Sequence, residues 1–279
     1  MRAPAGTRKA CRPSDGGFQI DVNTAVPLEE RRDDPRIALV SQFFEGTGAT
    51  YDRMVQWATL GIDGLWKRRM VRAMPADARR ILDLACGTGI STLAIARARP
   101  DAEIVGVELR EEYLQFARGK LAREPRPNVS LTLSRAEDYT SAVPFDCISS
   151  SYLAKYAELP RLINANRAML RPGGVLLMHD FTLPPNPLLR AIWRVYFRVM
   201  QHTVARVLPS WREIYFGLPR LIEATQWTTE LPQVLRTQGF EDIRVEYLTL
   251  GGSALVTART PEARPASQSI KSASPAGSR

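Results

Sequence analysis

The sequence predicts an α/β fold in which a largely parallel sheet is covered by helices on both faces. Between residues 80 and 179, short apolar runs alternate with segments of helical periodicity, and this alternation is typical of right-handed strand–helix–strand units. Near the C-terminal end, two apolar runs flank Gly251-Gly252, which predicts an antiparallel hairpin at a sheet edge. Residues 34–74, before the first strand, are predicted to form a helical cap.

The alternating region predicts five strands and three helices. The strands are expected at Arg80–Leu84, Glu103–Val107, Val129–Leu133, Phe145–Ser150 and Val175–His179, and the helices at Ser91–Ala98, Glu111–Leu121 and Leu159–Leu170. The stretch Arg171-Pro172-Gly173-Gly174 is expected to stop the last of these helices, because proline and glycine interrupt helical hydrogen bonding. Ligands of parallel sheets bind at the carboxyl ends of the strands, so the site is expected in the loops that follow the strands.

A long helical run interrupts this rhythm after the fifth strand. It covers residues 186–207, and it places Arg190, Arg194 and Arg198 on one face, four residues apart. We expect it to belong to a lid-helix insertion near residues 186–226. A further helix and the two hairpin strands are expected at Thr229–Gln238, Ile243–Leu248 and Ala254–Ala258.

The ends of the chain differ in composition from the middle. Residues 260–279 are rich in Ala, Ser and Pro, which predicts a disordered tail. Residues 1–33 are expected to be disordered or extended, and residues 34–259 to form one domain with its cap and lid insertion.

Composition limits the class of protein. The chain has 279 residues, of which 44% are hydrophobic, and a formal net charge of +9 that lies partly in its ends. A moderately basic domain fits nucleic acid, an anionic membrane surface or no specific partner, and we expect no nucleic acid. Three widely spaced cysteines and two distant histidines predict neither a disulfide framework nor a metal site, and a reducing, cytoplasmic location fits. The start of the chain lacks the apolar run of a secretory leader, and no stretch reaches the ~18 apolar residues of a membrane-spanning helix.

A glycine turn joins the first predicted strand to the first helix. Gly87 and Gly89 remove Cβ atoms where a ligand must approach the backbone, and Thr88 lies between them. Asp83 is costly in an apolar strand unless it is paired, so it is expected to meet an ammonium group or to orient the amides of the turn. A nicotinamide-binding turn would have a third glycine where this chain has Thr92, which disfavours an oxidoreductase.

Polar residues also follow the second and third strands. Glu108 lies about twenty residues after the glycine turn, where an acidic side chain can accept hydrogen bonds from both hydroxyls of a ribose. After the third strand, a loop over residues 134–138 can pass over an adenine, with a backbone amide for a ring nitrogen and a carboxylate for the exocyclic amine. The residues expected there are Arg135, Ala136 and Glu137.

The glycine turn, the acid after the second strand, the polar loop after the third and the edge hairpin together resemble class I S-adenosylmethionine-dependent methyltransferases. The resemblance is closest to the ubiquinone/menaquinone biosynthesis C-methyltransferase family, and it extends from about Phe43 to Ala258. It is carried by the segments Phe44–Met54, Gly61–Arg68, Phe145–Ile148, Met169–Gly174, Asn186–Arg190 and Leu248–Gly252. It implies a Rossmann-like seven-stranded methyltransferase sheet with an antiparallel C-terminal edge hairpin and an N-terminal helical cap.

The resemblance also implies a cofactor, S-adenosyl-L-methionine, and the residues that hold it. Family contacts fall on Thr88, Glu108, Arg135, Ala136 and Ser151. With their neighbours and the residues derived above, the expected cofactor site consists of Tyr51, Asp83, Ala85, Gly87, Thr88, Gly89, Glu108, Leu109, Arg135, Ala136, Glu137 and Ser151.

The chain departs from the family pattern on the acceptor side. Tyr152-Leu153-Ala154-Lys155-Tyr156 stands where the family has Phe-Gly-Leu-Arg-Asn. Arg135 replaces an aspartate or asparagine, and Val55 replaces an asparagine. These differences allow an acceptor other than that of the family.

Methyl transfer to the ring carbon of a phenol or quinol is helped by a base that takes the hydroxyl proton. His179 and Asp180 end the fifth strand, and Lys155 follows the fourth, so these three are the candidates for base and oxyanion partner. For His179 and Lys155, a structural histidine and a surface lysine are the alternatives. No metal is expected in this reaction.

We therefore expect an enzyme that methylates a lipophilic acceptor, most simply a ring carbon of a polyprenyl quinol. N- or O-methylation of another acceptor, such as a phospholipid amine or a secondary metabolite, and cofactor binding without catalysis are the alternatives. The aromatic helix around Trp193 and its arginines allow peripheral contact with a membrane. The oligomeric state does not follow from the sequence.

Overall fold

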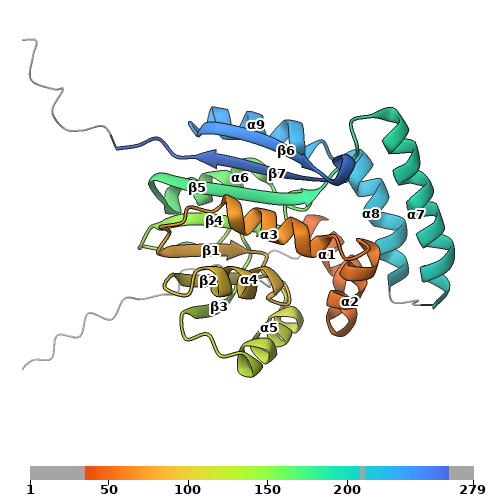
Figure 1. The fold of residues 1–279 in the computed structure, drawn as a ribbon, viewed down its shortest axis with the longest axis horizontal. Coiled ribbons are helices and arrows are strands. Elements are labelled where there is room, and N and C mark those ends of the chain that lie inside the picture. Colours follow the sequence, from red (N-terminus) through yellow and green to blue (C-terminus); the bar gives the residue numbers. More distant parts are fainter. Residues whose placement is uncertain (1–34, 208–210, 264–279) are drawn as a thin grey trace, which may run out of the picture. The chain divides into compact units, whose positions relative to one another are not determined.

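The structure is a computed structural model that describes residues 35–207 and 211–263. Its centre is a seven-stranded sheet in the order β3-β2-β1-β4-β5-β7-β6 (Figure 1). The strands are β1 Arg80–Leu84, β2 Glu103–Glu108, β3 Val129–Leu133, β4 Phe145–Ser151, β5 Leu170–Phe181, β6 Glu241–Leu248 and β7 Ser253–Arg259. The expected segment at 1–33 and residues 264–279 of the expected tail lie outside the described residues.

The sheet confirms the predicted fold class. Strands β1 to β5 pair in parallel, with β1 in contact with both β2 and β4. Strand β7 runs antiparallel to β5 and to β6, so the C-terminal hairpin forms the edge of the sheet. Because the parallel strands all end at one edge, their following loops gather there.

Helices cover both faces of the sheet. The helices are α1 Pro35–Phe44, α2 Gly48–Ala58, α3 Asp63–Ala73, α4 Ile90–Ala98, α5 Glu111–Arg123, α6 Leu159–Met169, α7 Pro187–Val207, α8 Arg212–Ala224 and α9 Trp227–Thr237. Apolar residues of α6 and α9 form one core with the sheet, in which Trp227 is fully buried. Apolar residues of α3 and α4 form a second core around Met70 and Ile95 on the other face.

Four helices lie beyond the carboxyl ends of the parallel strands. Figure 1 shows α1, α2, α7 and α8 together on this side, with α7 outermost. Phe43, Met54, Trp211 and Tyr215 belong to a third apolar cluster that joins these helices, which we call the cap cluster. The cap therefore covers the edge of the sheet where the site is expected.

Two details differ from the sequence prediction. Helix α6 ends at Met169, and the Pro-Gly-Gly stretch lies inside β5, which begins at Leu170. Leu170 pairs with Phe145 across a register shift, so backbone pairing to β4 begins before the proline rather than after it. Helix α8, which contains Pro219, was not identified as a helix from the sequence.

In the part of the chain that the structure describes, no helix has the length and apolar character needed to cross a membrane.

Substitution of Gly89 tests how tightly α4 is set against α5. Gly89 is the N-cap residue of α4 and has a φ of 83°, and a Cβ there would lie 3.0 Å from the Ala117 Cβ and 3.4 Å from its Cα. We expect Gly89→Ala to lower the free energy of unfolding by ~1–3 kcal/mol, because both the backbone conformation and the contact are unfavourable. Chemical denaturation measures this value.

Gly119 is the matched control, since it lies within helix α5 and a Cβ there meets nothing within 4 Å. Gly119→Ala is expected to raise stability by ~0.5–1 kcal/mol. Equal effects of the two substitutions would contradict the argument.

Candidate functional site

A cavity lies at the carboxyl ends of the parallel strands. Its walls come from the loops after β1, β2, β3 and β4, together with parts of α1, α2 and α5. The lining residues are Arg36, Ile37, Val40, Phe44, Tyr51, Ala85, Gly87, Val107, Glu108, Leu109, Arg110, Tyr113, Ser134, Arg135, Ala136, Glu137, Ser151, Tyr152, Leu153 and Tyr156. Nine of the twelve residues expected to hold a cofactor border this cavity; the exceptions are Asp83, Thr88 and Gly89.

Asp83 does not border the cavity; it lies in the core behind the glycine turn and fixes the elements that the turn connects. Its carboxylate is fully buried and accepts hydrogen bonds from Ser91 Oγ at 2.8 Å, Thr92 Oγ at 2.7 Å and Ser149 Oγ at 3.2 Å. Burial raises the pKa of Asp83, and the three hydroxyl groups oppose that rise. These contacts join β1 to the first turn of α4 and to β4. Thr92, at the third-glycine position, is thus one of the groups that satisfy the buried acid.

The turn itself has a backbone that suits glycine. Gly87 and Gly89 have φ values of 58° and 83°, and Ala85 has 53°. The Thr88 side chain turns away from the cavity, where its hydroxyl bonds to Asp52 and accepts from Lys120 Nζ at 3.0 Å. Gly87, whose Cβ position would have only Tyr113 nearby at 3.9 Å, leaves open space at the cavity wall.

Glu108 lies at the end of β2 and borders the cavity. Its two carboxylate oxygens accept backbone N–H bonds from Gly87 and Arg110, both at 2.9 Å. Burial raises the pKa of Glu108, and the backbone hydrogen bonds counteract that rise. A carboxylate has about four acceptor positions, so Glu108 can hold the turn and still accept hydrogen bonds from a ligand.

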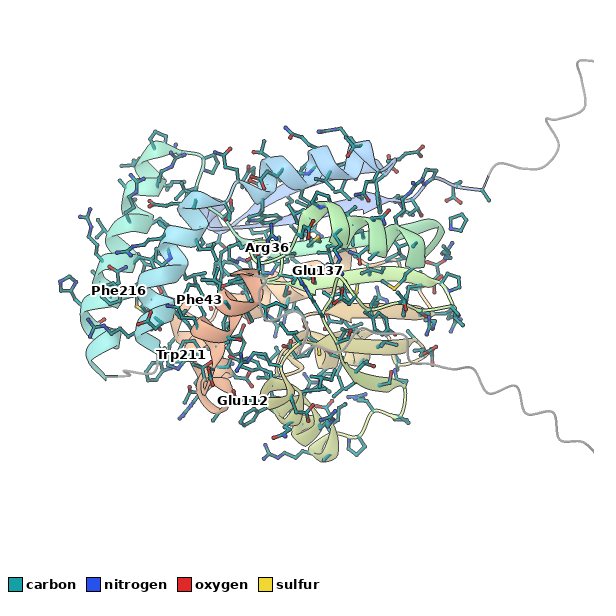
Figure 2. All side chains as sticks on the ribbon, turned by 180° about the vertical axis from the view of Figure 1, so that it is seen from behind. Arg36, Phe43, Glu112, Glu137, Trp211 and Phe216 are labelled. Carbon is teal, nitrogen blue, oxygen red and sulfur yellow. The ribbon has the colours of Figure 1, made fainter. Side chains whose placement is uncertain are left out.

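A buried ion pair follows β3. Arg135 donates to Glu137 from Nε at 2.9 Å and from Nη2 at 3.3 Å, and both side chains are almost fully enclosed. Ala136 lies between them at the cavity wall. Arg36, from α1, borders the same cavity near Glu137 (Figure 2). The loop after β3 is therefore fixed by its own charges beside the cavity.

Aromatic rings form the wall of the cavity toward the cap. Tyr51 lies edge-on to Tyr113, with 5.2 Å between ring centroids, and Phe44 lies 5.8 Å from Tyr156. The Trp211 ring packs 6.1 Å from Tyr51 and belongs, like Phe43, to the cap cluster (Figure 2). This end of the cavity is suited to a flat, apolar ligand.

Tyr152 connects the cavity with a buried polar pair. It follows β4 with a φ of 66°, which is unusual for a residue with a side chain. Its hydroxyl donates to Asp63, which also accepts from Lys67 Nζ at 2.6 Å. The Lys67 Nζ lies 4.8 Å from the centre of the Tyr152 ring, and the ring stacks on Phe181 at 4.7 Å. Burial and the charge of Asp63 raise the pKa of Tyr152 well above its usual value.

Lys155 and Asp180, two of the three candidates for catalysis, contact each other and do not border the cavity. Lys155 Nζ bonds to Asp180 Oδ1 in a fully buried ion pair. Asp180 also accepts the backbone N–H groups of Lys155 at 3.3 Å and of Phe181 at 2.7 Å. The pair therefore ties the loop after β4 to the end of β5.

His179, the third candidate, is also buried behind the cavity wall. Its Nε2 lies 2.7 Å from Ser253 Oγ, which donates to the Asp180 carbonyl at 3.1 Å. The direction of the Ser253–His179 hydrogen bond depends on the histidine tautomer, and Nδ1 has no hydrogen-bond partner among the residues that the structure describes. Burial, with the nearby charges of Lys67 and Lys155, lowers the pKa of His179 well below its usual value. The imidazole is therefore neutral at physiological pH.

The sequence analysis missed several lining residues. Arg36, Val40 and Phe44 come from α1, and Tyr113 comes from α5. The hydrophobic periodicity of these two segments predicted helices, but it did not indicate which helix would cover the cavity. Tyr152 was recognised only as a departure from a family pattern, and its link to Asp63, 89 residues away, has no local signal.

Solved structures share the fold at low sequence identity. A phosphoethanolamine N-methyltransferase 2 of Haemonchus contortus aligns with a TM-score of 0.57 and 13% identity, over 80% of this chain and 59% of that one. The CurJ carbon methyltransferase aligns with a TM-score of 0.55 and 15% identity, over 80% and 61%. The chain thus spans about three fifths of these proteins, and at such identities the likeness establishes the fold alone.

Sequence relatives are more informative. The chain is 30% identical over 228 residues to a demethylmenaquinone methyltransferase of Clavibacter sepedonicus, covering 81% of this chain and 91% of the relative. It is 33% identical over 216 residues to a ubiquinone/menaquinone biosynthesis C-methyltransferase, UbiE, of Syntrophotalea carbinolica, covering 75% and 88%. Residues 29–259 match the model of the ubiE/COQ5 methyltransferase family. The chain therefore belongs to the ubiE/COQ5 methyltransferase family.

Proposed function

We propose that the chain transfers the methyl group of S-adenosyl-L-methionine to a ring carbon of a lipophilic quinol. The observation that carries the proposal is the aromatic end of the cavity, which adjoins the glycine turn and Glu108 in one continuous space. The cavity then has one end for the cofactor, at the glycine turn and Glu108, and another end for a flat, apolar acceptor, with Tyr51 between them. Relatives named demethylmenaquinone methyltransferase and ubiquinone/menaquinone biosynthesis C-methyltransferase support the same acceptor class.

The residues at the cofactor end fit S-adenosylmethionine. The open space at Gly87 admits the amino acid part, and Glu108 accepts hydrogen bonds from the ribose. The backbone of Ala136, fixed between the paired Arg135 and Glu137, faces the adenine. When bound, the cofactor supplies an electrophilic methyl group, whose carbon–sulfur bond breaks as the acceptor carbon forms its new bond.

Asp83, Thr88 and Gly89 act on the cofactor indirectly. Asp83 holds the turn through Ser91 and Thr92, and Gly89 is the N-cap residue of α4. Ser151 and Leu109 line the cavity at the ends of their strands and contribute shape. Walls that exclude water and fix the two reactants in line supply much of the rate in such a transfer.

We assign the proton acceptor to the Tyr152–Asp63 pair. Tyr152 borders the cavity, whereas His179, Asp180 and Lys155 do not. A hydroxyl of the acceptor bound against Tyr152 passes its proton to the tyrosine oxygen, while the tyrosine proton moves to the Asp63 carboxylate. Loss of that proton raises the nucleophilicity of the ring carbon. After methyl transfer, the ring C–H proton leaves to water, and Asp63 returns its proton to the acceptor oxygen by the same route.

Lys155, Asp180 and His179 are positioning residues in this assignment. The buried Lys155–Asp180 pair fixes the loop that carries Tyr152 and Tyr156. His179 packs against the Tyr152 ring, with 5.2 Å between ring centroids, and stays neutral. Tyr156, in the place of a family asparagine, offers a hydroxyl at the aromatic end of the cavity.

We further propose that the chain works in the cytoplasm and touches a membrane from its surface. A polyprenyl quinol resides in a bilayer, so an enzyme that methylates it must take its substrate from lipid. The alternative is N- or O-methylation of another acceptor, such as a phospholipid amine or a secondary metabolite. A polar acceptor of that kind would not need the aromatic wall around Phe44 and Tyr156. Binding of the cofactor without turnover is the remaining alternative.

Turnover decides between these functions. The purified chain is incubated with labelled S-adenosylmethionine and a panel of demethylated benzoquinols and naphthoquinols, phospholipids and small phenols. We expect label in a ring carbon of a quinol and none in phosphatidylethanolamine. Label on nitrogen or oxygen would replace the proposed acceptor, and cofactor binding by calorimetry with no product on any acceptor would leave only a binding role.

Substitution of Glu108 tests the cofactor end. Because hydrogen bonds to a charged group contribute ~1.5–3 kcal/mol, we expect Glu108→Ala to weaken S-adenosylmethionine binding at least ~10-fold by calorimetry. Glu111→Ala is the matched control: this acid lies three residues away in α5, at the surface, paired with Arg118. Unchanged affinity in Glu108→Ala would remove Glu108 from the site.

Substitution of Tyr152 tests the proton acceptor. Tyr152→Phe keeps the ring that stacks on Phe181 and removes only the hydroxyl. We expect kcat for the quinol to fall ~10²–10⁴-fold, as for loss of general base catalysis, with cofactor affinity unchanged. Tyr247→Phe, at an exposed position of β6, is the control and should keep full activity. Full activity of Tyr152→Phe would exclude the relay, and a slower rate restored by raising the pH would support it.

A further inference from the structure

Helix α7 carries a row of apolar side chains that face away from the protein. Leu188, Ile192, Val195 and Val199 are 69%, 57%, 55% and 54% exposed. Their spacing of four, three and four residues places them on one face of the helix. We call this row the α7 seam. Such a continuous apolar row on one helix is unlike apolar residues scattered singly over a surface, and it indicates a contact.

The rest of α7 is fixed to the protein, so the seam has a defined outward direction. Tyr196 donates its hydroxyl to the Ala58 carbonyl, and Gln201 Nε2 donates to the Tyr215 carbonyl at 3.1 Å. Met200 packs against the cap cluster. Figure 1 shows α7 as the outermost helix on the side where the parallel strands end. The seam therefore lies on the same side of the sheet as the cavity.

The charges beside the seam select its occupant. Residues 187–207 contain no aspartate or glutamate. Arg194 and Arg198 are exposed on one flank of the seam, and Arg194 pairs with Glu223 of α8 at 2.7 Å. A second copy of the helix laid on the seam would bring no acid of its own to pair with Arg198, because residues 187–207 contain none. A partner that is apolar inside and negatively charged at its margin fits both the apolar row and the arginine beside it.

We propose that the α7 seam docks on the surface of an anionic bilayer. The apolar row enters the boundary between headgroups and acyl chains, while Arg198 meets lipid phosphates at the margin. The helix lies in the plane of the interface and does not cross the membrane. The docking itself does not depend on the proposed function. Only its role does: if the acceptor is dissolved in lipid, docking brings the cap side of the cavity to the membrane that contains it.

The test is binding of the full chain to vesicles in the absence of cofactor and acceptor. Flotation with vesicles of phosphatidylcholine alone is compared with vesicles that also contain phosphatidylglycerol. We expect binding that requires the anionic lipid and weakens with salt, because screening reduces the attraction to headgroups. The double substitution Ile192→Glu with Val195→Glu should weaken vesicle binding at least ~10-fold. It removes two aliphatic side chains that would enter the bilayer and adds two negative charges that anionic headgroups repel.

Val143→Glu is the matched control. Val143 is 57% exposed and precedes β4, at the opposite edge of the sheet from the cap. It should bind vesicles like the natural chain, and circular dichroism should show all three proteins folded. The seam variant should also retain methylation of a water-soluble short-chain quinol without vesicles, which separates a failure of docking from a failure of the proposed function.

Three results would overturn the proposal. One is absence of vesicle binding by the natural chain, and another is equal binding by the seam variant. The third is a dimer in sedimentation velocity that the seam substitutions convert to monomer, because that outcome would make the seam an interface between copies of this chain.

Discussion

The arrangement of the cavity depends on one buried carboxylate. Hydroxyl groups of Ser91, Thr92 and Ser149 surround the Asp83 carboxylate and donate hydrogen bonds to it. A buried charge without such donors would be strongly unfavourable, so the strand, the first turn of α4 and β4 must keep their relative positions. The glycine turn bridges these elements, and its path is fixed as a result. Glu108 then completes the turn by accepting the Gly87 N–H.

A second set of buried charges fixes the acceptor side. The Lys67–Asp63 and Lys155–Asp180 pairs both lie near Tyr152, with the two lysine nitrogens 4.8 and 5.8 Å from the centre of its ring. Buried ion pairs of this kind contribute less to stability than their number implies, because desolvation offsets much of their attraction. Their effect here is on conformation. They hold Tyr152 at a left-handed φ that a lone loop would not maintain.

The fold class and the edge of the sheet that carries the cavity could be predicted from the sequence because their signals are local. Strand periodicity, the Gly87–Gly89 turn and Glu108 lie within thirty residues, and each has a physical meaning at its own position. The sequence also placed Asp83 correctly as a buried acid that needs partners. It expected an ammonium group or the amides of the turn, whereas the structure places the hydroxyl groups of Ser91, Thr92 and Ser149 there. Hydroxyl side chains at helix starts and in strands are too common for the sequence to have singled these out.

The acceptor side could not be predicted for a different reason. Tyr152 contacts Asp63 and Lys67, which lie about ninety residues earlier in the chain, and α1 meets α8 across the cap cluster. Pairings at such separations are set by the tertiary fold and leave no periodic trace. His179 and Lys155 were singled out because strand ends face the ligand edge. Their side chains instead turn to Ser253 and Asp180, where partners were available.

The polar pairs around Tyr152 require that water be excluded, and the cap that excludes it must also admit the acceptor. The pairs around Tyr152 are strong only while water is excluded, because a lower local dielectric strengthens every charge interaction. The cap cluster and the aromatic wall supply that exclusion, and under the proposed function an acceptor passes between them to reach Tyr152. An apolar acceptor entering along apolar helices can do so without bringing its own hydration shell. A polar acceptor would have to shed water at an aromatic wall, which is why the geometry of the cap favours a lipophilic substrate.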